Sequence, residues 1–307
     1  MTMNDPGAAI ANVHDGLLRF LIEASGVRGV LVRLSDTWAA VRQRADYPPA
    51  VAACLGETLA ATALMTGHAK IDGRLSVQLR GTGALRSLFA ECTRDGTLRG
   101  LARYSEPLPD PLGPRAFGQG SLLAITIENV AVGGRDGMRY QGMVGLESDT
   151  MAEAFEGYFT QSEQLPTRML LAADGETASG LMLQKLPGQV DDGDGWRRAA
   201  AVFETLGRDE LLATAPGELL FRLFHEDGVR LLDSRALEFG CSCSRERVLA
   251  MFQRLGREES LAAADENEPP VAEVSCEFCG HSYRLPREEL LELFRQPPAM
   301  PAPEALQ

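Results

Sequence analysis

Four of the six cysteines occur as two close pairs near the C-terminal end of the 307-residue sequence. Cys241 and Cys243 form a C-x-C pair, and after 32 intervening residues Cys276 and Cys279 form a C-x-x-C pair. Two pairs of thiolates, each presented from a tight turn, are the ligand set of a tetrahedral zinc site. We therefore interpret these four cysteines as the ligands of one zinc ion.

Three other interpretations of the cysteines stay open at this point. His281 can take the place of one sulfur, although four cysteines already complete the ligand shell. A thioredoxin-type C-x-x-C begins the first helix of a βαβ unit, whereas this pair lies between the strand-like segments VAEVS and HSYRL. The main alternative is a zinc-ribbon regulator that binds protein or nucleic acid and uses zinc only for structure. The segment between the pairs is acidic, which disfavours nucleic acid.

The residues beside the cysteines predict the turns that present them. We expect Ser244 to cap a helix that Gly256 ends. Three apolar side chains are expected to share one face of this helix: Val248, Phe252 and Leu255. Gly280 can take the positive φ that follows a metal-binding turn. We expect nearby arginines to offset the negative charge of a zinc ion with four thiolates: Arg245, Arg247, Arg284 and Arg287.

The segment 240–294 is predicted to be a redox switch as well as a metal site. It has few large apolar side chains, and a domain of about 55 residues usually needs metal or disulfides to stay folded. Metal binding then contributes to folding, so removing zinc should unfold the domain. Thiols two or three positions apart can close labile disulfides. The favoured products are Cys241–Cys243 and Cys276–Cys279, and neither can hold zinc.

Residues 1–188 predict an α+β core domain with a mostly antiparallel sheet packed with helices. The predicted strands are rich in residues that suit a pleated surface, and lie at 30–34, 74–81, 85–92, 97–104, 121–130 and 139–147. A hairpin connection is expected at 133–137. One helix is indicated by apolar residues at every fourth position, namely Val51, Leu55, Leu59 and Ala63. A second helix is expected to begin with a capping box at Thr150 and Glu153.

Residues 189–239 are predicted to be a helical linker, since Pro, Gly and Asp residues mark a boundary at 186–195. One helical stripe runs through Trp196, Ala200, Phe203 and Leu206, and a second lies at 217–225. A segment this apolar must lie on another surface, and the sheet of the core domain is the expected one. The proline-rich end at 295–307 predicts a disordered tail.

Composition excludes several classes of function. The net charge of -13 repels phosphate backbones and anionic lipid, so we expect no nucleic-acid or membrane partner. A secretory signal and an apolar run long enough to span a membrane are both missing, which predicts a cytoplasmic protein. The four histidines are scattered and no nucleophile or phosphate-binding motif occurs, so an enzyme is not expected. Cys54 and Cys92 are expected to be inert, half-buried small residues.

The two cysteine motifs, with FGQGSLLAITIEN, YFTQSEQLPT and GLMLQKLP, resemble the heat shock protein 33 family, the redox-regulated 33 kDa chaperonins. The resemblance extends from about Asp15 to Phe294. It implies an α+β core, a helical linker wrapped over that core, and a C-terminal zinc domain. It also implies that the reduced, zinc-bound form is inactive. Peroxide or hypochlorous acid, with mild unfolding, would form two disulfides and expose a surface that holds unfolding client proteins without ATP. Active members tend to form homodimers.

The resemblance assigns the roles of zinc ligand and redox switch to the four cysteines by matching position. Gly280 stands where several family members have asparagine, which does not affect the ligands. Client-binding residues cannot be mapped one by one from the resemblance. Our hypothesis is that apolar linker residues first cover and later provide the client surface: Trp196, Phe203, Leu219, Leu220 and Phe224.

Overall fold

The computed structural model describes residues 15–69, 71–129, 137–186 and 194–295. The chain divides into two units with the boundary between Gly240 and Cys241. The segment predicted as a separate linker belongs to the first unit. The end of the chain predicted as a disordered tail and most of the hairpin predicted at 133–137 lie outside the described residues.

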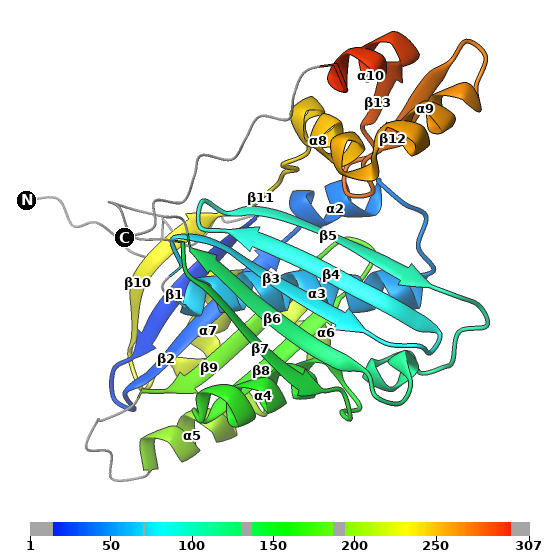
Figure 1. The fold of residues 1–307 in the computed structure, drawn as a ribbon. Helices are drawn as coiled ribbons and strands as arrows, with labels where there is room; N and C mark the ends of the chain where they lie inside the picture. Colours follow the sequence, from blue (N-terminus) through cyan, green and yellow to red (C-terminus); the bar gives the residue numbers. More distant parts are fainter. Residues whose placement is uncertain (1–14, 70, 130–136, 187–193, 296–307) are drawn as a thin grey trace, which may run out of the picture. The chain divides into compact units, whose positions relative to one another are not determined.

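The first unit is α+β, as predicted, but its strands form two sheets instead of one (Figure 1). One sheet has the strand order β10-β1-β2-β9-β8 and is built from β1 (Gly16–Ile22), β2 (Val27–Leu34), β8 (Thr167–Ala173), β9 (Ala178–Lys185) and β10 (Val229–Ala236). The other has the order β11-β5-β4-β3-β6-β7 and is built from β3 (Gly73–Arg80), β4 (Leu85–Thr93), β5 (Thr97–Tyr104), β6 (Leu122–Asn129), β7 (Arg139–Gly145) and β11 (Glu238–Phe239). All pairs are antiparallel except β11 with β5.

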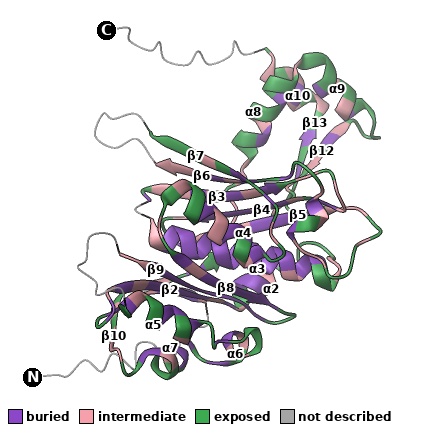
Figure 2. Cartoon of the chain, turned by 90° about the horizontal axis from the view of Figure 1, so that it is seen from below, coloured by how far each residue is buried: buried purple, intermediate pink, exposed green. Residues whose placement is uncertain are grey.

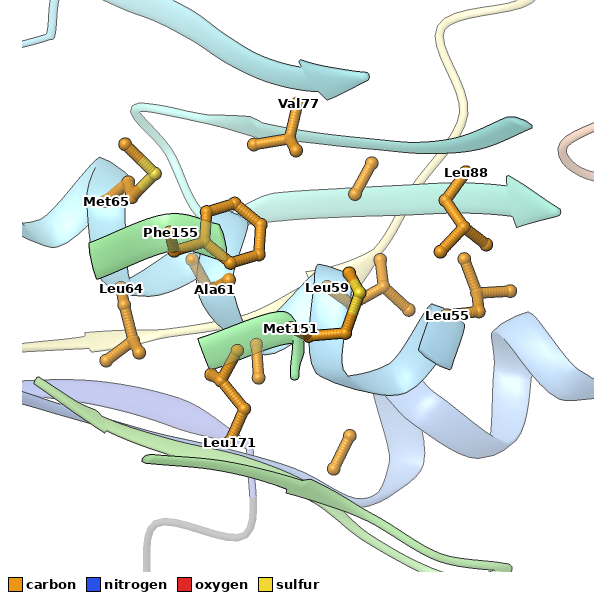
Figure 3. Close-up of a cluster of buried hydrophobic side chains, with 14 of the residues drawn as sticks. Leu55, Leu59, Ala61, Leu64, Met65, Val77, Leu88, Met151, Phe155 and Leu171 are labelled. Atoms are coloured by element: carbon orange, nitrogen blue, oxygen red, sulfur yellow. The ribbon is translucent and has the colours of Figure 1, made fainter. Parts of the chain in front are cut away.

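Helix α3 (Pro49–His68) lies between the two sheets and is buried on all sides (Figures 2 and 3). Its length and apolar composition would suit a membrane span, but 89% of its most apolar 18-residue window is buried inside the protein. Leu88 and Leu171 contribute to its packing from the two opposite sheets. Gly56 lets the helix approach closely, because a Cβ there would lie 2.6 Å from the Cβ of Ala173. The predicted helix is therefore confirmed as the centre of the core.

The smaller helices of the core are positioned by local signals. Helix α2 (Asp36–Arg42) follows β2, and a short 3₁₀ helix, η1 (Pro114–Phe117), precedes β6. Helix α4 (Met151–Tyr158) continues into a π-helical turn, η2 (Phe159–Glu163). Its predicted capping box is confirmed: the backbone N–H of Glu153 donates to Thr150 Oγ1 at 3.2 Å, and that of Thr150 donates to Glu153 Oε2 at 3.1 Å.

Three helices of the predicted linker cover the outer face of the five-stranded sheet (Figure 2). They are α5 (Asp194–Phe203), α6 (Arg208–Ala213) and α7 (Pro216–Phe224). The prediction that this segment consists of short helices lying on the core sheet is confirmed. The prediction that it stays helical to residue 239 is wrong, because β10 pairs with β1 from Ile22↔Val229 to Gly16↔Ala236. Residues 229–236 thus form a strand because they pair with the edge of β1, which would otherwise have no partner strand.

The second unit is small and contains α8 (Arg245–Leu255), α9 (Arg257–Asp265), α10 (Arg287–Leu293) and a hairpin of β12 (Val271–Ser275) and β13 (Ser282–Pro286). Ser244 caps α8 and Gly256 ends it at a φ of +100°, as predicted. Leu255 was expected to share a face of α8 with Val248 and Phe252; those two are buried, whereas Leu255, the last residue of the helix, is 48% exposed. Among the described residues of this unit, the buried core cluster has seven members: Val248, Phe252, Ala264, Ala272, Tyr283, Leu285 and Leu290.

Candidate metal centre and the linker-covered sheet

The structure brings the four predicted cysteines together in one cluster. Their Sγ atoms all lie within 4.8 Å of one another, and all four side chains are half-buried. Two of the separations join the pairs crosswise: Cys241 Sγ to Cys276 Sγ is 3.6 Å, and Cys243 Sγ to Cys279 Sγ is 3.4 Å. A closed set of four soft sulfur donors at these separations fits a tetrahedral structural metal site. The cluster is therefore able to bind a metal ion.

The second cysteine pair is held by a tight turn between β12 and β13. The backbone N–H of Cys276 donates to the carbonyl of His281 at 2.9 Å, and that of Gly280 donates to the carbonyl of Cys276 at 2.8 Å. Gly280 has a φ of +70°, as predicted for the residue after the pair. The His281 ring packs edge-on against Tyr283, with 4.6 Å between the ring centroids.

The first cysteine pair lies in the loop that enters α8. Ser244 Oγ accepts the backbone N–H of Arg247 at 3.3 Å, so the helix begins directly after Cys243. The positive end of the helix macrodipole is thereby placed next to the pair. Arg247 also fastens the loop, because its Nη1 donates to both the carbonyl and the hydroxyl oxygen of Ser242 at 2.7 Å. Cys243 packs against the small core of the unit.

Three of the four arginines expected to offset charge at the cysteines have carboxylate partners instead. Arg245 pairs with Glu289, Arg284 with Glu273 and Arg287 with Asp265. These pairs tie α10 to α8, β13 to β12 and α10 to α9, so they organise the unit around the cluster. Arg247 is the arginine of this group that holds the cysteine loop itself.

Burial raises the pKa of two of the clustered cysteines and of both isolated cysteines alike. Desolvation raises the pKa of Cys276, and it raises that of Cys279 to about 12, so metal ligation must displace the thiol protons. Cys54 and Cys92 were expected to be half-buried, but only 5% and 0% of their surfaces are exposed. Burial raises the pKa of Cys54 to about 12 and that of Cys92 to about 11, which makes both unreactive.

The five residues proposed as a client surface all belong to the apolar cluster between the linker and the five-stranded sheet. Four of them are buried, namely Phe203, Leu219, Leu220 and Phe224, and Trp196 is half-buried. The Phe224 ring lies 6.3 Å from that of Phe20 on β1, measured between centroids. The sheet supplies a matching apolar face: Leu18, Phe20, Ile22, Val27, Leu31, Ala172, Leu181 and Leu183.

An ion pair that the sequence interpretation missed joins the linker to the core. Arg208 Nη2 lies 2.5 Å from Glu57 Oε1, and Arg208 Nη1 donates to the carbonyl of Leu171 at 2.6 Å. A signal for it exists in the sequence, because Glu57 is the lone charged residue in the apolar stretch VAACLGETLAATALM. Such a residue is almost never buried unless it is paired.

Comparison with known proteins identifies the family. The sequence matches the family described as Hsp33 protein over residues 15–286, which include residues of both units. The chain belongs to the Hsp33 family. It is 41% identical over 286 residues to the 33 kDa chaperonin of Nitrosococcus oceani, covering 93% of this chain and 96% of that protein. It is also 41% identical over 282 residues to the 33 kDa chaperonin of Pseudomonas putida, covering 90% of this chain and 92% of that protein.

A solved structure shows the same fold. The crystal structure of the 33 kDa chaperonin, or heat shock protein 33 homolog, from Thermotoga maritima aligns with a TM-score of 0.77 at 24% identity. The alignment covers 92% of this chain and 98% of that one. The resemblance inferred from the motifs is thus confirmed, and this Hsp33 family member belongs to a family of chaperonins and not of enzymes.

Proposed function

We propose that the protein is a redox-regulated, ATP-independent holdase chaperone of the cytoplasm, inactive when reduced and zinc-bound. The observation that carries the proposal is the four-sulfur cluster in a unit whose described part, residues 241–295, has a buried core of seven residues. Such a core contributes little stability of its own. A structural zinc site in small domains is worth about 10–16 kcal/mol of apparent binding free energy, so ligation by Cys241, Cys243, Cys276 and Cys279 would decide whether this unit is folded.

Oxidation removes the ligands. Two cysteine thiols and one peroxide molecule give one disulfide and two molecules of water, so two sulfur-bound protons leave and two electrons pass to the peroxide oxygens. Two such reactions consume all four cysteines. A disulfide sulfur is no longer a thiolate ligand, and the second unit would lose its fold. Heat assists because it weakens the remaining packing.

We assign the disulfides to Cys241–Cys243 and Cys276–Cys279, although sulfurs of different pairs also lie close together in the folded cluster, at 3.6 Å for Cys241 and Cys276 and 3.4 Å for Cys243 and Cys279. Crosswise bonds would close loops of more than 30 residues and keep the two turns together. Once the unit opens, the entropy of loop closure favours partners that are near in sequence. Pairing within each turn therefore couples oxidation to loss of the folded unit.

The linker would transmit this change. Strand β11 ends at Phe239, two residues before Cys241. Unfolding of the second unit would therefore begin, along the chain, directly after the last strand of the first unit. Release of α5–α7 would uncover the apolar face formed by Leu18, Phe20 and their neighbours, and would free Trp196, Phe203, Leu219, Leu220 and Phe224. These surfaces would bind unfolding client proteins during oxidative and heat stress, and the active form would be a homodimer.

The test combines three measurements on one sample. The reduced, zinc-loaded protein is treated with peroxide at mildly elevated temperature while zinc release, free thiols and light scattering of an unfolding client are followed. We expect about one zinc ion released for four thiols lost, together with new suppression of aggregation without ATP. Loss of zinc with no gain of holdase activity would refute the proposal.

A further inference from the structure

The carboxylate of Glu57 occupies an unusual place for a charge. Its residue is only 7% exposed and lies in the middle of α3, between the two sheets. Burial raises the pKa of Glu57, and the charge of Arg208 counteracts that shift. Since an unpaired buried carboxylate is strongly unfavourable, Arg208 determines how well this site tolerates the charge.

Arg208 reaches the carboxylate from the other side of the sheet. It is the first residue of α6, which lies on the outer face of the five-stranded sheet, whereas α3 lies on the inner face (Figure 2). Strand β8 is the edge of that sheet, and its Leu171 carbonyl accepts the second guanidinium hydrogen bond. The Arg208 side chain thus passes the edge of β8 and connects a linker helix, an edge strand and the core helix.

A second ion pair between linker and core differs in its burial. Arg168 Nε on β8 lies 3.5 Å from Glu204 Oε1, which follows α5, but these side chains are 42% and 62% exposed. Exposed pairs contribute about 0–1 kcal/mol. At the Arg208–Glu57 pair the Arg208 side chain is 51% exposed, but the carboxylate side chain is only 10% exposed and the guanidinium makes two short hydrogen bonds. Among the described residues, this interface therefore has an ion pair with both partners exposed and another with a buried carboxylate.

We propose that the Arg208–Glu57 pair is a lock that holds the linker closed independently of the cysteine cluster. Opening the linker removes the guanidinium from Glu57 and from the Leu171 carbonyl. Both acceptors lie outside the second unit, so the two hydrogen bonds of Arg208 can break without any change at the cysteines. The lock rests on the proposed function only in that the closed linker is taken to be the inactive form.

The test measures linker opening directly in the reduced, zinc-loaded protein. Hydrogen exchange of the α5–α7 amides is compared for wild type, Arg208→Ala and the control Glu204→Gln, which breaks the exposed pair of the same interface. Arg208→Ala should raise exchange of these amides by about tenfold to a hundredfold, the range for a hydrogen bond to a charged group. Glu204→Gln should change it by less than about threefold. Zinc content should stay at the wild-type value in both.

A double-mutant cycle separates the lock from a general loss of stability. In the Glu57→Gln background, Arg208→Ala should raise exchange by clearly less than it does in wild type. Equal effects in the two backgrounds, or an Arg208→Ala linker as protected as that of the control, would overturn the lock. Arg208→Lys keeps the positive charge but has one nitrogen donor in place of the guanidinium fork, so its linker exchange should fall between that of wild type and that of Arg208→Ala. This variant still tests the lock if Arg208→Ala does not fold.

Failure of the lock and failure of the chaperone proposal give different results. If oxidised wild type suppresses aggregation but the Arg208 variants show no faster linker exchange, the lock is wrong and the chaperone proposal stands. If linker exchange rises as expected but oxidised wild type holds no client, the lock stands and the chaperone proposal is wrong.

Discussion

Replacing Phe224 by alanine should open the linker without oxidation. The Phe224 side chain is fully buried, at 0% exposure, and packs on Phe20 between α7 and β1. Replacing a buried phenylalanine by alanine costs about 3–5 kcal/mol. Phe224 belongs to the apolar cluster that linker and sheet form together. The closed linker therefore loses most of this amount relative to the open one, and the open population should rise by about 100-fold or more.

Phe221 provides a matched control on the same helix. It is 68% exposed, so Phe221→Ala removes the same atoms from the same element without emptying the interface. Surface substitutions of this kind change stability by about 0.5 kcal/mol or less. We expect hydrogen exchange of the α5–α7 amides in the Phe221 variant to stay within about threefold of wild type.

The assay uses reduced, zinc-loaded protein throughout, so the cysteine cluster is unchanged. Phe224→Ala should show faster exchange in α5–α7, binding of a hydrophobic dye and suppression of client aggregation without peroxide. Zinc retention and exchange within 241–295 should match wild type. Equal linker protection in the Phe224 and Phe221 variants would refute the idea that this apolar cluster keeps the linker closed.

Three further predictions address the cysteine cluster, the core helix and the effect of pH. Cys276→Ser should release zinc at chelator concentrations that wild type resists, and hydrogen exchange within 241–295 should become faster. The control Cys92→Ser should show neither effect. Titration with a chromophoric chelator compares the zinc affinities of the two variants. Gly56→Ala should lower the free energy of unfolding by about 1–3 kcal/mol, because the new Cβ would lie 2.6 Å from the Cβ of Ala173. In the control Gly157→Ala the new Cβ meets nothing within 4 Å, so the free energy of unfolding should not fall. Urea unfolding measures both variants. Burial lowers the pKa of His68 to about 3, so the unfolded state takes up the His68 proton at a higher pH than the folded state does. The free energy of unfolding should therefore decrease below about pH 6.5, by about 2 kcal/mol at pH 5. His68→Gln should flatten this part of the plot of unfolding free energy against pH.

The cysteine cluster could be predicted from sequence because its determinants are local. The two short spacings, the cap at Ser244 and the glycine at position 280 fix the two turns that present the sulfurs, and the folding of the unit then brings these turns together. The roles of the neighbouring arginines could not be predicted in the same way. Their partners Glu273, Glu289 and Asp265 become neighbours only when the hairpin and α10 have packed.

The number of sheets could not be read from the sequence for a physical reason. Strand β9 is almost entirely buried, since it is covered by α3 on one face and by the linker helices on the other. Such a strand loses the alternation of apolar and polar residues that identifies strands with one solvated face. Strand β10 gave the opposite difficulty, because it is mostly exposed and is defined by its pairing with β1.

The proposed oxidation of four cysteines out of six would be selective because of where the fold places them. Cys54 and Cys92 are buried in the apolar core around α3, so an oxidant reaches them only after the first unit has opened. The four clustered sulfurs are half-buried in a unit with a small core, and they lie within 4.8 Å of one another. Under the proposed function, an oxidant of the peroxide class would therefore react first in the unit with the smaller apolar core. The first unit, which has its own larger apolar core, would stay folded and present a surface while the second unit responds.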